Sequence, residues 1–203
     1  MGPTHVFCST YGRYLTGASA VVAVVVLVSM LVSDGVAYTV AHGAWPLLGV
    51  ALVAAVFWLP RVVVSDGGVE VRNVWRTVHV PWPAFRGVEA SYSLVVTTTE
   101  GRVTAWAAPR ASGAASRLRR GRGDLPEGPG AAPAGTVQRH PGTAEGAATA
   151  VAERYRALDA AGHLRGAARA VEAGVAPSRS WHARTLAVVA VLLLAGVAGT
   201  LAG

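Results

Sequence analysis

The pattern of apolar and polar positions divides the chain into long apolar runs and one alternating region. Three runs carry no Asp, Glu, Lys or Arg, and they cover residues 15–32, 36–59 and 185–202. At about 1.5 Å per helical residue, about 18 residues extend roughly 27 Å, close to the thickness of a bilayer's hydrocarbon core. Because Ser33, Asp34 and Gly35 separate the first two runs, the pattern predicts an N-terminal transmembrane hairpin over 1–60 and a single C-terminal transmembrane helix within 177–203.

Two other interpretations of these runs are open. Residues 13–41 have the length of a cleaved signal peptide with small residues near Ala37 or Ala41, although a second apolar run follows at once. The third run is short for a span and is also compatible with a re-entrant or surface helix, but it has no polar face to hold such a helix at the surface.

Inside the second run, His42 and Pro46 are the polar and helix-perturbing positions of note. An ionisable residue within a membrane is a functional candidate, and a proton relay would need a partner carboxylate at similar depth. The run contains no Asp or Glu. We therefore expect His42 to lie near the outer interface, beside Tyr38 and Trp45.

A region of alternating apolar and polar residues lies between the apolar runs, at 61–108. Asp66-Gly67-Gly68 separates two short runs rich in β-branched residues, and Asp-Gly is a strong hairpin signal because both residues tolerate the turn's positive φ values. The pattern predicts six short strands in an antiparallel sheet or partial barrel. They cover residues 62–65, 69–72, 76–80, 86–92, 94–98 and 102–107.

A change of composition follows the alternating region. Residues 109–142 are rich in Gly, Ala, Pro and Arg and poor in large apolar side chains, so we expect a disordered linker. Residues 143–176 are helical in pattern: Thr143 is an expected N-cap, and the apolar spacing of Val151, Tyr155 and Leu158 gives a helix to residue 161 one apolar face. This segment either closes the β domain or packs in a bundle between protomers.

The charged residues predict that the protein prefers anionic membranes, and they predict its orientation in the membrane. All 18 basic residues are arginine and the formal charge is +7, which favours anionic lipid headgroups. Arg13, Arg61 and Arg184 flank the runs, whereas the loop between the first two carries Asp34 and no base. The positive-inside rule then predicts a multi-pass plasma-membrane protein whose N-terminus and 61–184 segment are cytoplasmic and whose C-terminus lies outside.

The candidate contact residues for lipid or a partner are arginines of the alternating region and of the linker: Arg72, Arg76, Arg86, Arg117, Arg119, Arg120 and Arg122. The four in the linker are also compatible with a solvated charge run that contacts nothing.

Several stretches resemble a known family. They are the run from Val63 to Asn73, then His79-Val80-Pro81-Trp82, and then the run from Glu100 to Trp106. Together with two leading spans, they resemble the bacterial PH-like domain of actinobacterial membrane proteins grouped with low molecular weight protein antigen 6. The resemblance covers about 50 residues. It implies a PH-type fold, which is a strongly bent antiparallel sheet closed at one end by a helix, and it supplies no functional residues.

No motif for catalysis appears in the sequence. It lacks a nucleotide-binding glycine loop, a nucleophile elbow and a paired-histidine zinc helix. Cys8 is the single cysteine, which excludes an intrachain disulfide and a multi-cysteine metal site. We therefore expect no enzyme, no cofactor, no bound metal and no nucleic-acid partner.

The sequence thus predicts an α+β membrane protein that acts as a membrane-anchored interaction module. Such a non-catalytic adaptor or assembly factor would bind a protein or anionic lipid headgroups. A small transporter or channel accessory subunit, in which the transmembrane helices carry the function, is the alternative. A purely structural partner of a neighbouring membrane complex is a third hypothesis. The sequence does not indicate which oligomeric state the protein adopts.

Overall fold

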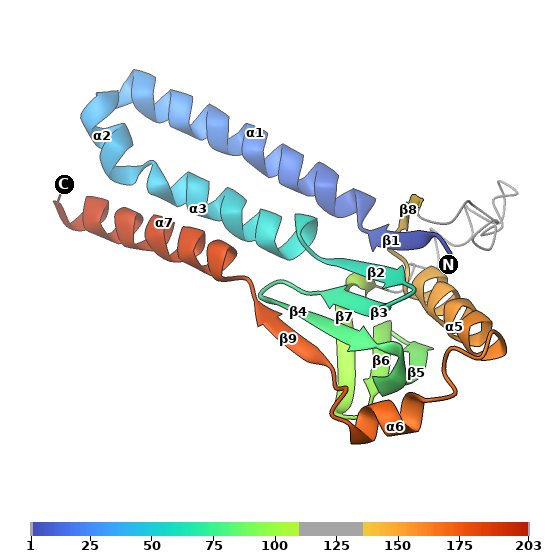
Figure 1. Ribbon diagram of the computed structural model, residues 1–203. Coiled ribbons are helices and arrows are strands. Elements are labelled where there is room, and N and C mark those ends of the chain that lie inside the picture. Colours follow the sequence, from blue (N-terminus) through green and yellow to red (C-terminus); the bar gives the residue numbers. More distant parts are fainter. Residues whose placement is uncertain (1, 110–135, 203) are drawn as a thin grey trace, which may run out of the picture. The chain divides into compact units, whose positions relative to one another are not determined.

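The computed structural model describes residues 2–109 and 136–202. Its chain divides into two compact units. The β unit comprises residues 1–9 and 60–180, and the apolar helical unit comprises residues 10–59 and 181–203. The sequence prediction of an α+β protein with apolar helices before and after a β region is confirmed (Figure 1).

Nine strands form two sheets within the described residues. The larger sheet has the order β8-β1-β2-β3-β4-β9, and the smaller has the order β5-β6-β7. The first sheet comprises β8 (Val137–Pro141), β1 (Thr4–Cys8), β2 (Arg61–Ser65), β3 (Gly68–Arg72), β4 (Arg76–Pro81) and β9 (Ser178–Trp181). The second comprises β5 (Phe85–Ala90), β6 (Ser93–Thr98) and β7 (Gly101–Pro109). Because β7 also lies against β2 and β3, the two sheets face one another.

The six strands predicted from alternation are confirmed as β2 to β7, with ends displaced by one to a few residues. Alternation places the valines of β2, β3 and β4 in the core and their polar neighbours outside. After β4, Pro81 removes a backbone donor and the chain turns through the short 3-10 helix η2 (Trp82–Ala84) into β5.

Helix α5 (Ala144–Ala160) closes the β unit. Its face of Ala144, Ala147, Ala150 and Val151 is buried with the valines of the sheets, and Tyr155 and Leu158 pack at the edge of the same core. The predicted N-cap is also present, because the Gly146 backbone N–H donates to Thr143 Oγ1 at 3.3 Å. Of the two uses expected for this helix, closure of the β unit is the one observed. A short helix, α6 (Ala167–Glu172), follows.

Three strands lie where the sequence analysis expected other structure. Thr4–Cys8 was expected to belong with the hairpin over 1–60, Val137–Pro141 with the linker over 109–142, and Ser178–Trp181 with the C-terminal helix region. The linker expectation is therefore wrong for β8, which pairs in parallel with β1. Backbone hydrogen bonds to an existing sheet stabilise an added strand even where its side chains show no clear alternation.

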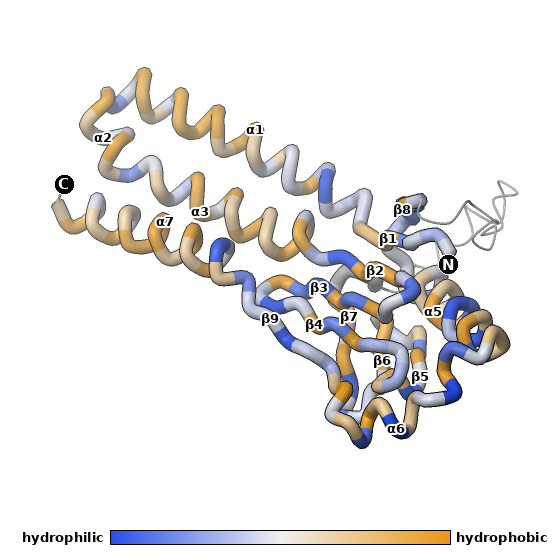
Figure 2. The backbone as a smooth tube through the Cα atoms, viewed as in Figure 1, coloured by the Kyte–Doolittle hydropathy of each residue, from blue (hydrophilic) through white to orange (hydrophobic). Residues whose placement is uncertain are grey.

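The apolar helical unit contains three helices that are long and apolar enough to cross a membrane: Thr10–Ser33, Gly35–Trp58 and Ala183–Ala202. They correspond to the three predicted spans. The first is α1 (Thr10–Ser33) and the third is α7 (Ala183–Ala202). Figure 2 shows these helices as predominantly hydrophobic along their length.

The second of these helices is not uniform. It consists of α2 (Gly35–His42), α3 (Ala44–Val53) and the π-helical turn η1 (Ala54–Trp58). Pro46 lies in the first turn of α3, where its missing N–H leaves no helical hydrogen bond broken, and the break precedes it at Gly43. His42 stacks on Tyr38 with ring centroids 4.2 Å apart, so the expected proximity of these two residues is confirmed.

Small residues allow close packing in this unit. A Cβ added to Gly199 of α7 would lie 1.7 Å from the backbone oxygen of Ala41 in α2. Most large apolar side chains of these helices point outward and are exposed. Close backbone approach at small residues, with apolar side chains outside, is typical of helices packed in lipid.

Candidate functional site

Three arginines gather at one end of the larger sheet. Arg61 begins β2 and lies opposite Arg72, which ends β3. Arg76 begins β4, and its neighbour Thr77 lies opposite Arg72. Cys8, at the end of β1, lies opposite Arg61. We call this the arginine end of the sheet. In antiparallel strands the end of one strand lies beside the start of the next, and this arrangement brings the three arginines together.

The chain connects to the apolar helices at the arginine end. β1 ends at Cys8 and α1 begins at Thr10, while η1 ends at Trp58 and β2 begins at Arg61. Both connections are two residues or fewer in length. Along the chain, two of the three connections between the units therefore start from the arginine end.

The arginine end brings three positive charges together on neighbouring strands. Burial, and after it the positive charge of Arg61, lower the pKa of Arg72, whereas Glu70 raises it. Among the residues that the structure describes, no carboxylate forms an ion pair with Arg61, Arg72 or Arg76. Since like charges directly opposite each other on neighbouring strands are destabilising, an anion bound here would stabilise the arrangement.

The β3–β4 turn next to these arginines is held by Asn73. Its Nδ2 donates to the Thr104 carbonyl at 2.8 Å, and its Oδ1 accepts from the Trp106 backbone N–H at 2.8 Å. These two bonds join the turn to the middle of β7. Trp75 of the turn and Trp106 of β7 are both exposed.

Arg86 lies away from the other candidate residues. It follows η2 and β4, so the full length of β4 separates it from Arg76, which is about 17 Å for a strand of this length. Its Nη1 donates to the carbonyls of Pro83 and Phe85 at 2.9 and 3.0 Å. The structure thus brings Arg72 and Arg76 together and leaves Arg86 apart. Arg117, Arg119, Arg120 and Arg122 lie outside the described residues.

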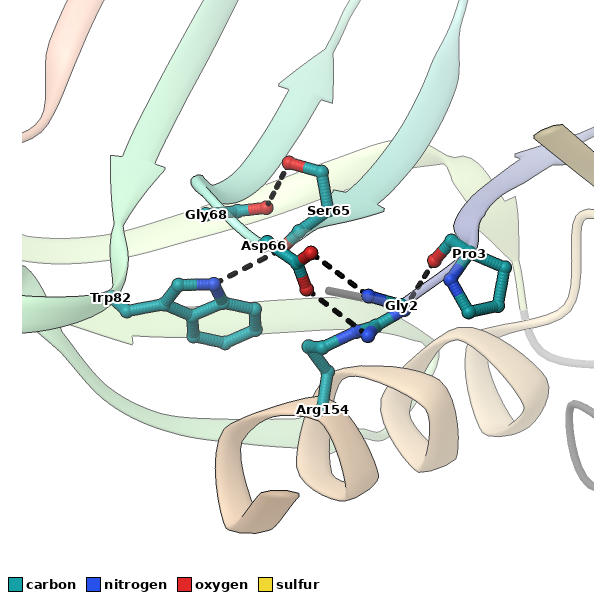
Figure 3. Close-up of polar contacts among 7 residues, drawn as sticks. All are labelled: Gly2, Pro3, Ser65, Asp66, Gly68, Trp82 and Arg154. Atoms are coloured by element: carbon teal, nitrogen blue, oxygen red, sulfur yellow. Dashed lines mark hydrogen bonds and ion pairs between the residues drawn. The ribbon is translucent and has the colours of Figure 1, made fainter. Parts of the chain in front are cut away.

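The opposite end of the sheet is organised by a carboxylate. Asp66, in the β2–β3 turn, accepts from the Gly2 backbone N–H at 2.9 Å and forms an ion pair with Arg154 of α5 at 3.1 Å. Arg154 also donates to the Pro3 carbonyl. Figure 3 shows these groups converging on the turn, with Trp82 Nε1 donating to the Ser65 carbonyl at 3.0 Å. At this turn the charge of Arg154 is therefore paired with the carboxylate of Asp66.

Two histidines meet across β1 and β8. His5 Nδ1 lies 3.1 Å from His140 Nε2, and the His140 ring stacks on Phe7 with centroids 5.2 Å apart. Burial, with the charges of His140 and Arg154, lowers the pKa of His5. A neutral pair sharing one hydrogen bond fits this environment, and it serves to join β8 to the sheet.

Within the described part of the chain, no group of three or more His, Cys, Asp or Glu side chains is placed to hold a metal ion. His79 lies opposite Glu70 on the exposed face of the sheet, where it has no nucleophile beside it. What the arrangement offers is a positively charged surface with exposed tryptophans, which is suited to binding.

Sequence reasoning missed Arg61, Asn73 and the two tryptophans as parts of one surface. A signal for Arg61 was present, because a hairpin centred on Asp66-Gly67 with Ser65 opposite Gly68 places residue 61 opposite residue 72. The bonds of Asn73 to β7 join residues about 30 positions apart, and strand alternation carries no information on such a contact.

Comparison with known proteins gives one match. The family model described as "Bacterial PH domain" matches residues 59–124, which is about a third of the chain. No curated protein and no solved structure matches. The matched region begins just before β2 and includes β2 to β7. A PH domain is typically a non-catalytic module, and the match supports a PH-domain-containing protein.

Proposed function

We propose that the protein is a membrane-anchored PH-like interaction module. It acts as a non-catalytic adaptor or assembly factor, and its β unit binds a protein partner or anionic lipid headgroups at the cytoplasmic membrane face. One observation carries this proposal: three arginines that form no ion pair with any described carboxylate lie at one end of the β unit, and through that end the chain continues into helices apolar enough to span a membrane.

The pairing of β1 with β2 supports a hairpin topology. β1 precedes α1 and β2 follows η1, yet the two strands are hydrogen-bonded neighbours from His5 opposite Val64 to Cys8 opposite Arg61. Both strands therefore lie on one side of any membrane that the intervening helices cross. Two crossings satisfy this requirement, and α7 then carries the C-terminus to the other side.

Charge supports the cytoplasmic side for the β unit. Arg13 lies near the start of α1, Arg61 follows the second apolar helix, and Arg184 lies at the start of α7, whereas Asp34 marks the turn between α1 and α2. Arginines beside spans favour the cytoplasmic side. Arg13 also lies over the ring of Trp58 at 5.7 Å, which is a typical pairing of a basic and an aromatic side chain at a membrane interface.

Photo-crosslinking in native membranes tests this function. A photoreactive amino acid is placed in the full chain at Arg76, Glu89 or Tyr92 of the β unit, or at Val191, an exposed apolar position of α7. We expect a defined protein or lipid adduct from at least one β-unit position and only lipid from Val191. A specific protein captured from Val191 alone would instead assign the function to the helices, and the absence of any adduct from the β unit would contradict the proposal.

A further inference from the structure

Two exposed tryptophans belong to the two elements that Asn73 joins at the arginine end, the β3–β4 turn and β7. Trp75 is 36% exposed in the β3–β4 turn, and Trp106 is 59% exposed on β7. The two bonds that Asn73 makes to Thr104 and Trp106 hold these elements together. By contrast, Trp82 of the same unit is 3% exposed and packs in the core. The exposed pair contributes to no core and needs another environment for its indole rings.

Positive charge lies close to Trp75. Arg76 is the residue next to Trp75, and Arg61 lies one strand beyond Arg72 in the same sheet. Arg61 and Arg76 are exposed, and no described carboxylate pairs with either of them. Indole rings beside guanidinium groups match the headgroup layer of a bilayer, where tryptophan is enriched and phosphate supplies negative charge.

Chain length keeps this surface near the membrane. Arg61 follows Trp58 by three residues, so their Cα atoms are at most about 11 Å apart whatever the orientation of the β unit. The polar region on each side of the hydrocarbon core is about 5 to 8 Å thick. Because β2 begins this close to an apolar helix, the arginine end of the β unit is within reach of the headgroups.

We propose that the arginine end docks on the anionic headgroup layer of the same bilayer that holds the apolar helices. Trp75 and Trp106 insert at headgroup level, and Arg61 and Arg76 contact lipid phosphates. The inference rests on the proposed function and specifies its ligand as a lipid surface. The far end of the β unit, with Asp66 and Arg86, then faces away from the bilayer.

The six tryptophans of the chain allow a direct test. The full chain is labelled with 5-fluorotryptophan and reconstituted in anionic nanodiscs, its fluorine resonances are assigned by single Trp→Phe changes, and lipids with a spin-labelled headgroup are added. Line broadening falls steeply with distance from the headgroups. We expect Trp75 and Trp106 to broaden as strongly as Trp58 and Trp181, which flank the apolar helices, and Trp82 to stay sharp.

The outcomes separate this inference from the function on which it rests. If Trp58 and Trp181 broaden while Trp75 and Trp106 stay as sharp as Trp82, the docking surface is wrong and membrane anchoring stands. If none of the resonances broadens, the helices are not in the bilayer and both proposals are overturned.

Two matched double variants test the contribution of arginine charge to docking on the membrane. The double variant Arg61→Gln/Arg76→Gln is compared with Arg86→Gln/Arg156→Gln, which removes two exposed arginines, one on β5 and one on α5. In anionic nanodiscs we expect the first variant to lose most of the broadening at Trp75 and Trp106, and the second to keep it. Raising the salt from about 0.1 M to about 1 M shortens the screening length from about 10 Å to about 3 Å and should act like the first variant. Equal behaviour of the two variants would refute a phosphate contact by Arg61 and Arg76.

Discussion

At the scale of single residues, Asp66 joins three segments that are far apart in the sequence. Its carboxylate holds the Gly2 backbone and Arg154 of α5, and it stands in the β2–β3 turn. Side-chain exposure is 11% for Arg154 and 30% for Asp66, so solvent screens this pair less than a surface pair. The N-terminal strand therefore depends on a polar cluster as well as on its own pairing.

Replacing Arg154 by Gln tests that dependence. The change removes the ion pair and leaves Asp66 partly buried, so we expect a loss of about 1–3 kcal/mol in the local stability of β1. This loss corresponds to roughly five- to 150-fold faster hydrogen exchange of residues 4–8. The control is Arg156→Gln, an exposed position on the same helix, which should change exchange little. Equal rates in the two variants would show that the cluster contributes nothing.

His5 makes the stability of the β unit depend on pH. Because its pKa is lowered in the folded state, the unfolded chain binds the proton more readily, and stability falls as pH decreases below the unfolded pKa of about 6.5. Above that pH the contribution is fully present. We expect the amides of β1 and β8 to have lower protection factors at pH 5.5 than at pH 7.5, once exchange is corrected for the pH dependence of the intrinsic rate, and we expect His5→Gln to reduce this difference. His79→Gln, on the exposed face, is the control, and a pH response that survives His5→Gln would assign it elsewhere.

At the scale of elements, the tight approach of β3 to β4 depends on Gly68. Its φ is +149°, and a Cβ at this position would lie 2.3 Å from the Val80 carbonyl oxygen. A Cβ added to the neighbouring Gly67 would have only Ser65 Oγ within 4 Å, at 3.9 Å. We expect Gly68→Ala to destabilise the β unit by about 1–3 kcal/mol and Gly67→Ala to cost about 0.5 kcal/mol or less. Thermal unfolding of the two variants measures the difference, and equal midpoints would show that this β3–β4 geometry is wrong.

The packing of α2 against α7 depends on Gly199 in the same way. Since its added Cβ would overlap the Ala41 backbone oxygen, Gly199→Ala should force the two helices apart. Gly49, which has nothing within 4 Å of its added Cβ, provides the control. Oxidative crosslinking between cysteines introduced at Ala41 and at Ala202, which lies one turn from Gly199 on the same side of α7, should fall in the Gly199→Ala background and persist with Gly49→Ala. Unchanged crosslinking would rule out this crossing.

Whether an element can be predicted from the sequence depends on whether a local pattern or its neighbours in the sheet specify it. The six strands β2 to β7 have strong alternation and a hairpin turn, so a local pattern identifies them. In β1 only His5 and Phe7 are buried, and in β9 every side chain is exposed. Such strands are specified by the backbone groups of their neighbours. The candidate site is predictable to the same degree: Arg72 and Arg76 follow from strand register, while Asn73 and Trp106 depend on a contact between the sheets.

At the scale of the whole molecule, the β unit is assembled from residues on both sides of the first two apolar helices. Because β1 pairs with β2, the proposed membrane anchoring would place these two strands on the same side of the membrane. It also places the end of α7 across the membrane from the β unit if all three apolar helices span. The account as a whole depends on that topology.

Cysteine labelling in intact cells tests the topology most directly. In a Cys8→Ser background, a single cysteine replaces Tyr92, which is 87% exposed in the β5–β6 turn, or Leu201, which is 82% exposed near the end of α7. With a membrane-impermeant maleimide, we predict that Leu201→Cys is labelled in intact cells and that Tyr92→Cys is labelled only after permeabilisation. Labelling of Tyr92→Cys in intact cells would contradict a cytoplasmic β unit held by three membrane-spanning helices.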